Sequence, residues 1–139
     1  MSTNLPTEVG VRLERFLRPS RIAVVATVGK TGAPQRTPNW YRYANGTLTI
    51  STTKERLKYV NLSRDSRLVV CIYSGTLARQ YVTLRGRAQI IEGESIWPET
   101  RAIVERYETP GRVETRMRRL RTQNRVIIAL KPERVAFRD

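Results

Sequence analysis

Apolar and polar positions follow two different periods along the chain, and together they predict a few helices around a set of strands. Residues 8–17 repeat apolar side chains at helical spacing, and Pro19 ends that helix. Residues 22–28 form a short β-branched run that is typical of a buried strand. Residues 80–91 alternate between apolar and polar side chains, which predicts a half-buried strand with Gly86 as a bulge or a point of close approach.

A hairpin is predicted in the first half of the chain. Its first strand spans residues 35–43 and contains Pro38, which indicates an edge position or a bulge. The dipeptide Asn45-Gly46 is a strong hairpin signal, and the strand that returns from it spans residues 48–52.

A helix is expected at residues 54–63, directly after that returning strand. Thr52 and Glu55 match the capping-box pattern just ahead of it. Residues 67–73 are again β-branched and predict a further strand.

The last third of the chain mixes both periods. A helix is expected at residues 96–107, and residues 109–124 are polar and rich in arginine, which indicates a loop or a solvated helix. Residues 126–130 and 134–137 close the chain as one bent strand or as two short ones. The whole pattern predicts one domain over residues 1–139, a mainly β, antiparallel closed or split barrel of about six strands with two or three peripheral helices.

Charge and composition narrow the function. Basic residues number 26 against 12 acidic ones, a net charge of +14, and 22 of the basic residues are arginine. Such a field favours an anionic ligand or partner, although a general bias toward arginine remains an alternative. The chain has no histidine, which argues against zinc chemistry and Ser-His-Asp hydrolysis, so no metal site is expected. Cys71 is the single cysteine, so no internal disulfide is expected.

The N-terminal segment does not resemble a signal peptide, because no basic start leads into an apolar run. No apolar stretch approaches the roughly 20 residues that span a bilayer. We therefore expect a cytoplasmic protein without a membrane partner.

The segment from residue 50 to residue 62 is the strongest candidate for a binding site. A helix start there presents free backbone N–H groups and the positive end of its dipole to an anion. The hydroxyls of Ser51, Thr52 and Thr53 can donate hydrogen bonds, and Arg56 and Lys58 add charge in the first turns. This combination predicts a phosphate site, and an ordinary capped helix with solvated charges is the alternative.

The strand before the hairpin offers surface beside that site. Asn39 and Trp40 provide a polar and an aromatic side chain close to the turn that leads to the phosphate segment. Trp40 as a plain core residue is the alternative. Tyr41, Tyr43 and Tyr73 are conceivable proton donors, and a packing role is the expectation for each.

In their order and spacing, these pieces resemble the pyridoxamine phosphate oxidase-like split-barrel superfamily, and within it the deazaflavin-dependent reductases. The matching pieces are G-x-P after the first strand, a T-P-x-W-like strand, then S-T, R-x-K-x-x-N-L-x-R-D and the later YVTLRGRAQI. The resemblance covers roughly residues 15 to 92. It implies a six-stranded Greek-key split barrel and a homodimer with two cofactor sites at its interface.

The resemblance also implies roles for single residues. Ser51, Thr52, Arg56 and Lys58 match positions that hold the cofactor phosphate. Four residues of the preceding strand match positions that contact the flat ring, namely Arg36, Thr37, Pro38 and Asn39. Asn61 is expected to support the site from behind, and Gln80, with Arg79 as a further candidate, to reach the cofactor of the neighbouring subunit.

Two cofactors agree with this resemblance, coenzyme F420 and FMN. Both carry a phosphate and a tricyclic ring, and the arginine-rich surface favours F420 because F420 also carries an acidic tail. The implied reaction is hydride transfer to an unidentified small molecule, in which the cofactor supplies the chemistry, so no catalytic side chain is assigned. The vitamin B6 oxidases of this superfamily carry a histidine-containing substrate motif. Because this chain has no histidine, pyridoxamine phosphate oxidation is not expected.

Two other functions remain open at this point. A carrier that binds the cofactor without turnover would share every motif. A nucleic-acid-binding barrel would explain the net charge, Arg85 and Arg87, and the arginine cluster at residues 116–121. Only 7% of the residues are aromatic, and no stacking platform for bases is visible, so a nucleic-acid partner is not expected.

Overall fold

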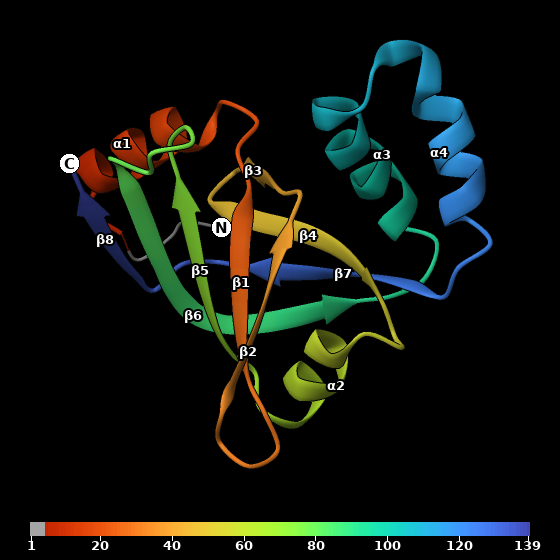
Figure 1. Ribbon diagram of the computed structural model, residues 1–139, viewed down its shortest axis with the longest axis horizontal. Coiled ribbons are helices and arrows are strands. Elements are labelled where there is room, and N and C mark those ends of the chain that lie inside the picture. Colours follow the sequence, from red (N-terminus) through yellow and green to blue (C-terminus); the bar gives the residue numbers. More distant parts are fainter. Residues whose placement is uncertain (1–4) are drawn as a thin grey trace.

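Alternating side chains build one antiparallel sheet that curls into a half-barrel at the centre of the molecule (Figure 1). The computed structural model describes residues 5–139. The strands are β1 (Ala23–Val28), β2 (Pro34–Asn39), β3 (Arg42–Ala44), β4 (Thr47–Thr53), β5 (Arg67–Tyr73), β6 (Tyr81–Ile91), β7 (Arg125–Leu130) and β8 (Arg134–Arg138). The helices are α1 (Thr7–Leu17), α2 (Leu57–Arg64), α3 (Ile96–Tyr107) and α4 (Val113–Leu120), with a 3₁₀ turn, η1 (Pro110–Arg112), between the last two.

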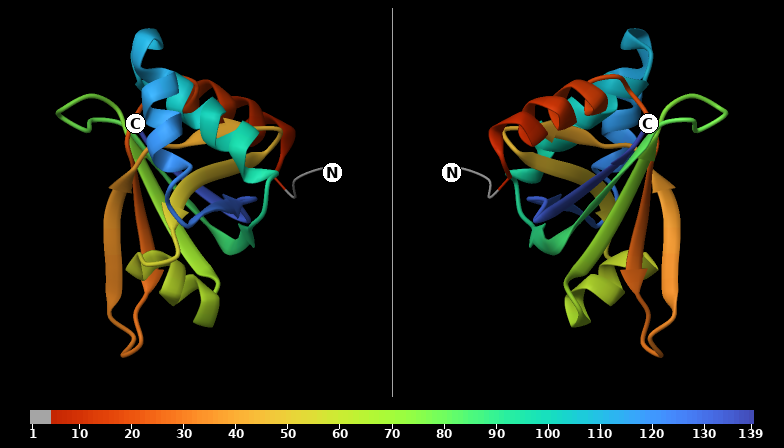
Figure 2. Two further views of the ribbon diagram at one scale, coloured as in Figure 1. Left: turned by 90° about the vertical axis from the view of Figure 1, so that its right-hand side faces the viewer. Right: turned by 90° about the vertical axis from the view of Figure 1, so that its left-hand side faces the viewer.

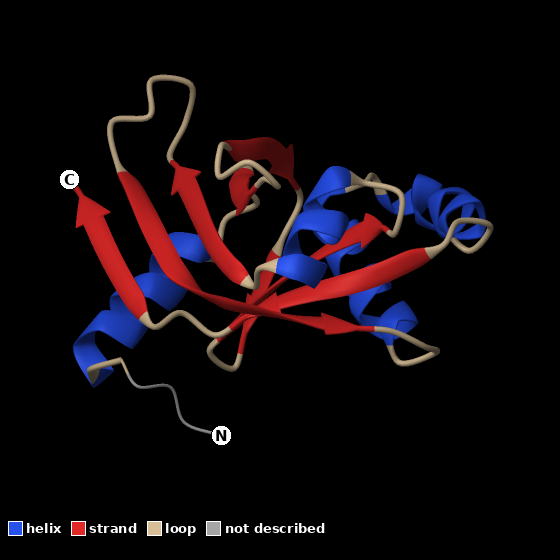
Figure 3. Ribbon diagram, turned by 90° about the horizontal axis from the view of Figure 1, so that it is seen from below, coloured by secondary structure: helices blue, strands red, loops and turns tan. Residues whose placement is uncertain are grey.

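The strand order across the sheet is β2-β1-β5-β6-β7-β4-β3, and β8 pairs with β6 outside this path. Seen from below, α1 lies at the end of the molecule near the C-terminus, and the α3–α4 pair lies at the opposite end (Figure 3). Two views from the sides show the α3–α4 pair beside the β-structure, and the loop between β5 and β6 projecting away from it (Figure 2).

β6 connects the two halves of the sheet. Its first part, Tyr81–Arg87, pairs with β5, and its last part, Ala88–Ile91, pairs with β7. The strand changes partners beside Gly86, where a β-carbon would lie 2.8 Å from Leu130 Cδ1 and 3.2 Å from the Lys131 carbonyl oxygen. The predicted close approach at Gly86 is confirmed, because only a glycine leaves room for the neighbouring strand.

The core fills the inner face of the curled sheet and is closed by α1. Leu13 and Leu17 of α1 pack against inward-facing side chains of β1, β4, β5, β6 and β7. A smaller cluster lies under α3, where Ile96 and Ile103 contact Ile127 of β7. The apolar periods of the sequence therefore become one main core and a satellite that carries α3.

The sequence predicts about six strands, whereas the structure has eight among residues 5–139. The predicted strand at 35–43 is interrupted at Trp40 and Tyr41, because the Tyr41 side chain turns into the core and its hydroxyl donates hydrogen bonds to the carbonyls of Leu17 (2.8 Å) and Pro19 (3.0 Å). The C-terminal pair consists of two separate strands, because Pro132 follows β7 and β8 pairs with β6 instead of β4.

The sequence predicts two or three helices, whereas the structure has four α-helices in the described part of the chain. Residues 109–124, predicted as a loop or a solvated helix, contain η1 and α4. One face of α4 is apolar, and Val113 and Met117 on it are buried with Val104 of α3. The high arginine content of α4 hides this short apolar stripe in the sequence.

The predicted capping box before α2 is wrong. The N-cap residue is Arg56, and no side chain caps the helix. β4 continues through Thr53, so Thr52 is still in strand conformation, too far from the helix to cap it. The predicted hairpin, in contrast, is confirmed, with φ of 53° at Asn45 and 76° at Gly46, as a type I′ turn requires.

Within residues 5–139, no helix is both long enough and apolar enough to cross a bilayer.

Gly86→Ala is expected to lower the free energy of unfolding by about 1–3 kcal/mol, because the added methyl group overpacks the junction with buried Leu130 and the Lys131 backbone. Urea unfolding measures this change. Gly10→Ala in α1 is the matched control. Nothing lies within 4 Å of its added β-carbon, so this substitution should stabilise the protein by about 0.5–1 kcal/mol. Equal changes in the free energy of unfolding for the two substitutions would contradict the close approach of the strands at Gly86.

Candidate cofactor-binding site

A cavity of about 370 Å³ lies where the ends of β2, β4 and β7 meet the start of α2 and the α3–α4 pair. Its lining comes from all of these elements and consists of Ile22, Pro38, Asn39, Trp40, Ser51, Arg56, Thr100, Ile103, Val104, Arg116, Leu120 and Arg125. One part of this set is apolar and another part is cationic, and no lining residue is acidic.

Trp40 dominates the apolar wall. Its indole stacks on the Tyr107 ring with 5.0 Å between ring centroids and 3° between the planes. Ile103 and Val104 of α3 and Leu120 of α4 continue the wall. A flat aromatic surface beside aliphatic side chains is suited to a planar ring system.

Three guanidinium groups form the cationic part, those of Arg56, Arg116 and Arg125. Arg125 Nε donates a hydrogen bond to Ser51 Oγ (3.0 Å), which fixes the Arg125 side chain against β4. Burial lowers the pKa of Arg125, and the charges of Arg56 and Arg116 lower it further. The arginines are thus close enough to repel one another, and an anion among them would relieve this repulsion.

Lys58 lies buried next to these groups, with only 1% of its surface exposed. Burial, followed by the charges of Arg56 and Arg125, lowers the pKa of its ammonium to about 8. Within residues 5–139, no carboxylate forms an ion pair with Lys58. A buried ammonium beside two guanidinium groups is costly unless a negative charge compensates it, so this cluster has the electrostatics of an anion site.

Arg116 reaches the cavity from α4. Its Nε donates a hydrogen bond to Glu108 Oε2 in an ion pair, and its guanidinium carbon lies 4.9 Å from the centroid of the Trp40 ring. Arg116 and Arg112 lower the pKa of the Glu108 carboxyl group, so the carboxylate persists below its usual range.

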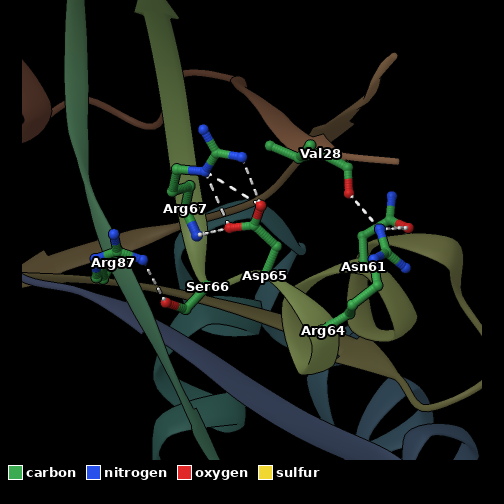
Figure 4. Close-up of polar contacts among 7 residues, drawn as sticks. All are labelled: Val28, Asn61, Arg64, Asp65, Ser66, Arg67 and Arg87. Atoms are coloured by element: carbon green, nitrogen blue, oxygen red, sulfur yellow. Dashed lines mark hydrogen bonds and ion pairs between the residues drawn. The ribbon is translucent and has the colours of Figure 1, made fainter. Parts of the chain in front are cut away.

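α2, which carries Arg56 and Lys58, is held on the sheet by Asn61. The buried Asn61 amide donates a hydrogen bond to Thr27 Oγ1 (3.0 Å) on β1. Arg64, one turn later, donates to the Val28 carbonyl oxygen (2.7 Å) and contacts Asn61 Oδ1 (Figure 4). Asn61 therefore holds α2, and with it Lys58, against β1, and its expected role behind a cofactor site stays a prediction.

Arg106 attaches the end of α3. Its Nε donates to the Tyr41 carbonyl oxygen (2.9 Å), and its other nitrogens donate to carbonyls of the segment after α1, including that of Pro19 (3.2 Å). Tyr107 donates its hydroxyl hydrogen to the Arg21 carbonyl oxygen (2.6 Å). These bonds fix Trp40 and the wall that it forms.

The structure brings four of the eleven predicted site residues to the cavity, namely Pro38, Asn39, Ser51 and Arg56. Lys58 lies next to it. Arg36 is exposed on β2, and Thr37 lies beside the Asn39 side chain without lining the cavity.

The remaining predicted residues lie elsewhere. Thr52 and Thr53 are both buried, and strand alternation turns Thr52 to the core side, with Leu48 and Ile50. Gln80 lies at the base of the β5–β6 loop, away from this cavity. Its expected contact with a neighbouring subunit stays a prediction.

The predicted cofactor-binding residues did not include Arg125, nor Arg116, which was considered only as part of an arginine cluster. Arg125 starts β7, and only the pairing of β7 with β4, which places it opposite Thr53, brings it to Ser51. Arg116 belongs to a run of arginines in which no residue stands out. Helical spacing from Val113 and Met117 was the available signal that this run has an inner side.

Tyr41 was considered as a proton donor, but its hydroxyl is hydrogen-bonded to the backbone carbonyls of Leu17 and Pro19. Burial raises the pKa of Tyr41 to about 12, with a further contribution from Tyr107. Tyr41 is a packing residue, as expected.

One protein family, described as pyridoxamine 5'-phosphate oxidase, matches residues 11–139 of the chain. The chain belongs to the pyridoxamine 5'-phosphate oxidase family. The resemblance inferred from the sequence motifs is thereby confirmed at the level of the family. No curated protein is similar enough in sequence to match the chain.

Solved structures share the family fold. The conserved hypothetical protein Rv2991 from Mycobacterium tuberculosis is 24% identical, with a TM-score of 0.78 over 99% of this chain and 86% of that one. A structure titled F420 reductase is 21% identical, with a TM-score of 0.71 over 88% of this chain and 94% of that one. General Stress Protein 26 from Bacillus anthracis is 15% identical, with a TM-score of 0.71 over 96% and 95%. At these identities the likeness shows the fold.

Lys58→Met is expected to raise the free energy of unfolding of the cofactor-free protein near neutral pH, because the variant no longer buries an uncompensated ammonium. In the wild type, the pKa of Lys58 in the folded state lies below its ordinary value of 10.5. The unfolded state therefore binds more protons between these two values, and the Lys58 contribution to stability becomes more favourable as the pH rises. The difference in free energy of unfolding between Lys58→Met and wild type should therefore decrease as the pH rises from about 7 to about 10.

Urea unfolding across this pH range measures the difference. Lys30→Met, at an exposed lysine in the turn between β1 and β2, is the control and should change stability by less than about 0.5 kcal/mol. A difference between Lys58→Met and wild type that stays constant with pH would contradict the assigned environment of Lys58.

Proposed function

We propose that the protein is an oxidoreductase that binds coenzyme F420, with FMN as the alternative, and transfers hydride to a small molecule. The observation that carries this proposal is the cluster of Arg56, Lys58 and Arg125. Arg56 and Arg125 line a cavity that has no acidic lining residue, and the buried Lys58 lies next to them. A phosphate group is the simplest ligand that compensates such a cluster.

The residues present fit a phosphorylated flavin-type cofactor. Arg56, Lys58, Arg125 and the Ser51 hydroxyl would hold the phosphate, and the first turn of α2 adds backbone donors. Pro38, Asn39 and the Trp40 wall would border the flat ring. When bound, the cofactor supplies the hydride chemistry, while these residues bind it, orient it and keep water from its apolar side.

Membership of the pyridoxamine 5'-phosphate oxidase family and the F420 reductase among the similar structures support this proposal. The net charge of +14 favours F420 over FMN, because F420 carries further negative charge in its tail. We do not propose pyridoxamine phosphate oxidation. The chain has no histidine, whereas the resemblance to the vitamin B6 oxidases implies a histidine in the substrate motif.

A carrier function without turnover is the second candidate. The observation that favours it is that no residue lining the cavity is a general acid or base near neutral pH. Multiple-turnover oxidation of the reduced cofactor by an added acceptor would decide for the enzyme. Tight binding of both cofactor redox states without turnover would decide for the carrier.

The affinity test compares FMN with riboflavin, which lacks the phosphate, and F420 is titrated in parallel. FMN should bind at least about tenfold more tightly than riboflavin, because charge-assisted bonds to a phosphate contribute ~1.5 kcal/mol or more. Arg56→Gln should weaken the binding of FMN and of F420 by about tenfold. The affinity for riboflavin should stay unchanged within about twofold. Cofactor fluorescence measures each dissociation constant.

Arg119→Gln, at an exposed arginine of α4 outside the cavity, is the charge-matched control. It should leave all three affinities nearly unchanged. Failure of both FMN and F420 to bind would overturn the proposed function, and equal losses in the two variants would show that only overall charge matters.

We further propose a homodimer with the cofactor at its interface. Support comes from the outer face of β1, β5 and β6, where Val24, Val69 and Cys71 are only partly buried and no helix of the described chain covers them. Sedimentation equilibrium should give twice the chain mass of 16.0 kDa. A monomer at micromolar concentration would contradict this arrangement.

A further inference from the structure

We propose that Arg116 determines substrate specificity by binding the carboxylate of a planar, apolar acceptor molecule. This inference rests on the proposed function, since it assigns the acceptor to the part of the cavity that the cofactor phosphate does not occupy. Four observations carry it: the element that bears Arg116, its orientation, its aromatic neighbour and its unmatched donors.

Arg116 comes from a different part of the fold from the other cations. Arg56, Lys58 and Arg125 belong to the sheet or to α2 beside it, whereas Arg116 lies on α4, which packs on α3. The α3–α4 pair thus brings its own positive charge to a cavity whose other charges come from the barrel.

The orientation of Arg116 leaves a binding edge. Its Nε is engaged by Glu108, a carboxylate that is largely buried, with 12% of its side chain exposed. Within the described residues, no acceptor is hydrogen-bonded to the two terminal nitrogens, which carry four N–H donors. A guanidinium that presents both terminal nitrogens matches the two oxygens of a carboxylate.

The surroundings of Arg116 favour a flat ligand. Its guanidinium lies over the Trp40 ring, which is part of the stack with Tyr107, and Leu120 one turn further along α4 also lines the cavity. Because Tyr107 and Arg116 cover the faces of the Trp40 ring, a planar apolar molecule would meet the edge of this stack and Leu120 while its acidic group meets Arg116.

The unmatched donors of Arg116 favour a negative charge on this molecule. A cofactor phosphate would be held by Arg56, Lys58 and Arg125. The Nε of Arg116 is paired with Glu108, and its terminal nitrogens then remain for the acceptor. A neutral hydrocarbon surface would cover these N–H donors without accepting from them, and this is unfavourable in a partly desolvated site.

The experiment uses three probes on the protein saturated with FMN and on the cofactor-free protein. They are 2-naphthoate (planar and anionic), 2-naphthamide (planar and neutral) and cyclohexanecarboxylate (anionic and not planar). Isothermal titration calorimetry gives each dissociation constant for wild type, Arg116→Gln, Arg116→Lys, Arg119→Gln and Arg56→Gln. Thermal unfolding verifies that each variant is folded.

The naphthoate should bind wild type more tightly than either other probe. Arg116→Gln should weaken naphthoate binding by about tenfold, as expected for loss of a charge-assisted bond. It should change the affinity for the naphthamide by less than about twofold. Arg116→Lys keeps the charge and loses the planar fork, so its affinity for the naphthoate should lie between those of wild type and Arg116→Gln. Arg119→Gln should match wild type.

Three outcomes would overturn the inference: no preference for naphthoate over naphthamide, equal losses in Arg116→Gln and Arg119→Gln, or a naphthoate affinity that depends on Arg56 instead of Arg116. The proposed cofactor function fails separately, when FMN and F420 do not bind. The cofactor-free titrations still test Arg116 in that case.

Discussion

The close approach of β6 to the β7–β8 connection at Gly86 is the constraint on which the rest of the structure depends. One continuous strand serves both halves of the sheet because its backbone can pass this close to Leu130 and Lys131. The pairing of β6 with β7 sets the position of β7, and the pairing of β7 with β4 then places Arg125 beside Ser51. The close packing at Gly86 therefore helps to determine where the positive charge of Arg125 lies in the cavity.

The cations at the cavity lower the stability of the protein without a ligand. Lys58 and Arg125 are held close together with their pKa values lowered, an arrangement that a fold selected for stability alone would avoid. Hydrogen bonds elsewhere offset this cost, such as those from the Asn61 amide to Thr27 and from the Arg106 guanidinium to the Tyr41 carbonyl. An anionic ligand removes the repulsion, so the apo protein is the strained state and the complex the relaxed one.

The sequence predicted what short-range chemistry determines. The type I′ turn at Asn45-Gly46, the close approach at Gly86 and the cations at positions 56 and 58 all follow from residue type and local spacing. What it could not predict depends on long-range pairing. Arg125 reaches the site only through strand register, and the break at Trp40 results from Tyr41 bonding to carbonyls 22 and 24 residues earlier.

The α3–α4 pair has no strand pairing with the barrel and is attached through side chains, chiefly Glu99 to Arg42 and Thr49, and Arg106 to backbone carbonyls. Strand pairing thus constrains the barrel, whereas side-chain contacts constrain the helical pair. Because this pair is one continuous segment between β6 and β7, its replacement would change one wall of the cavity and leave the strand order intact.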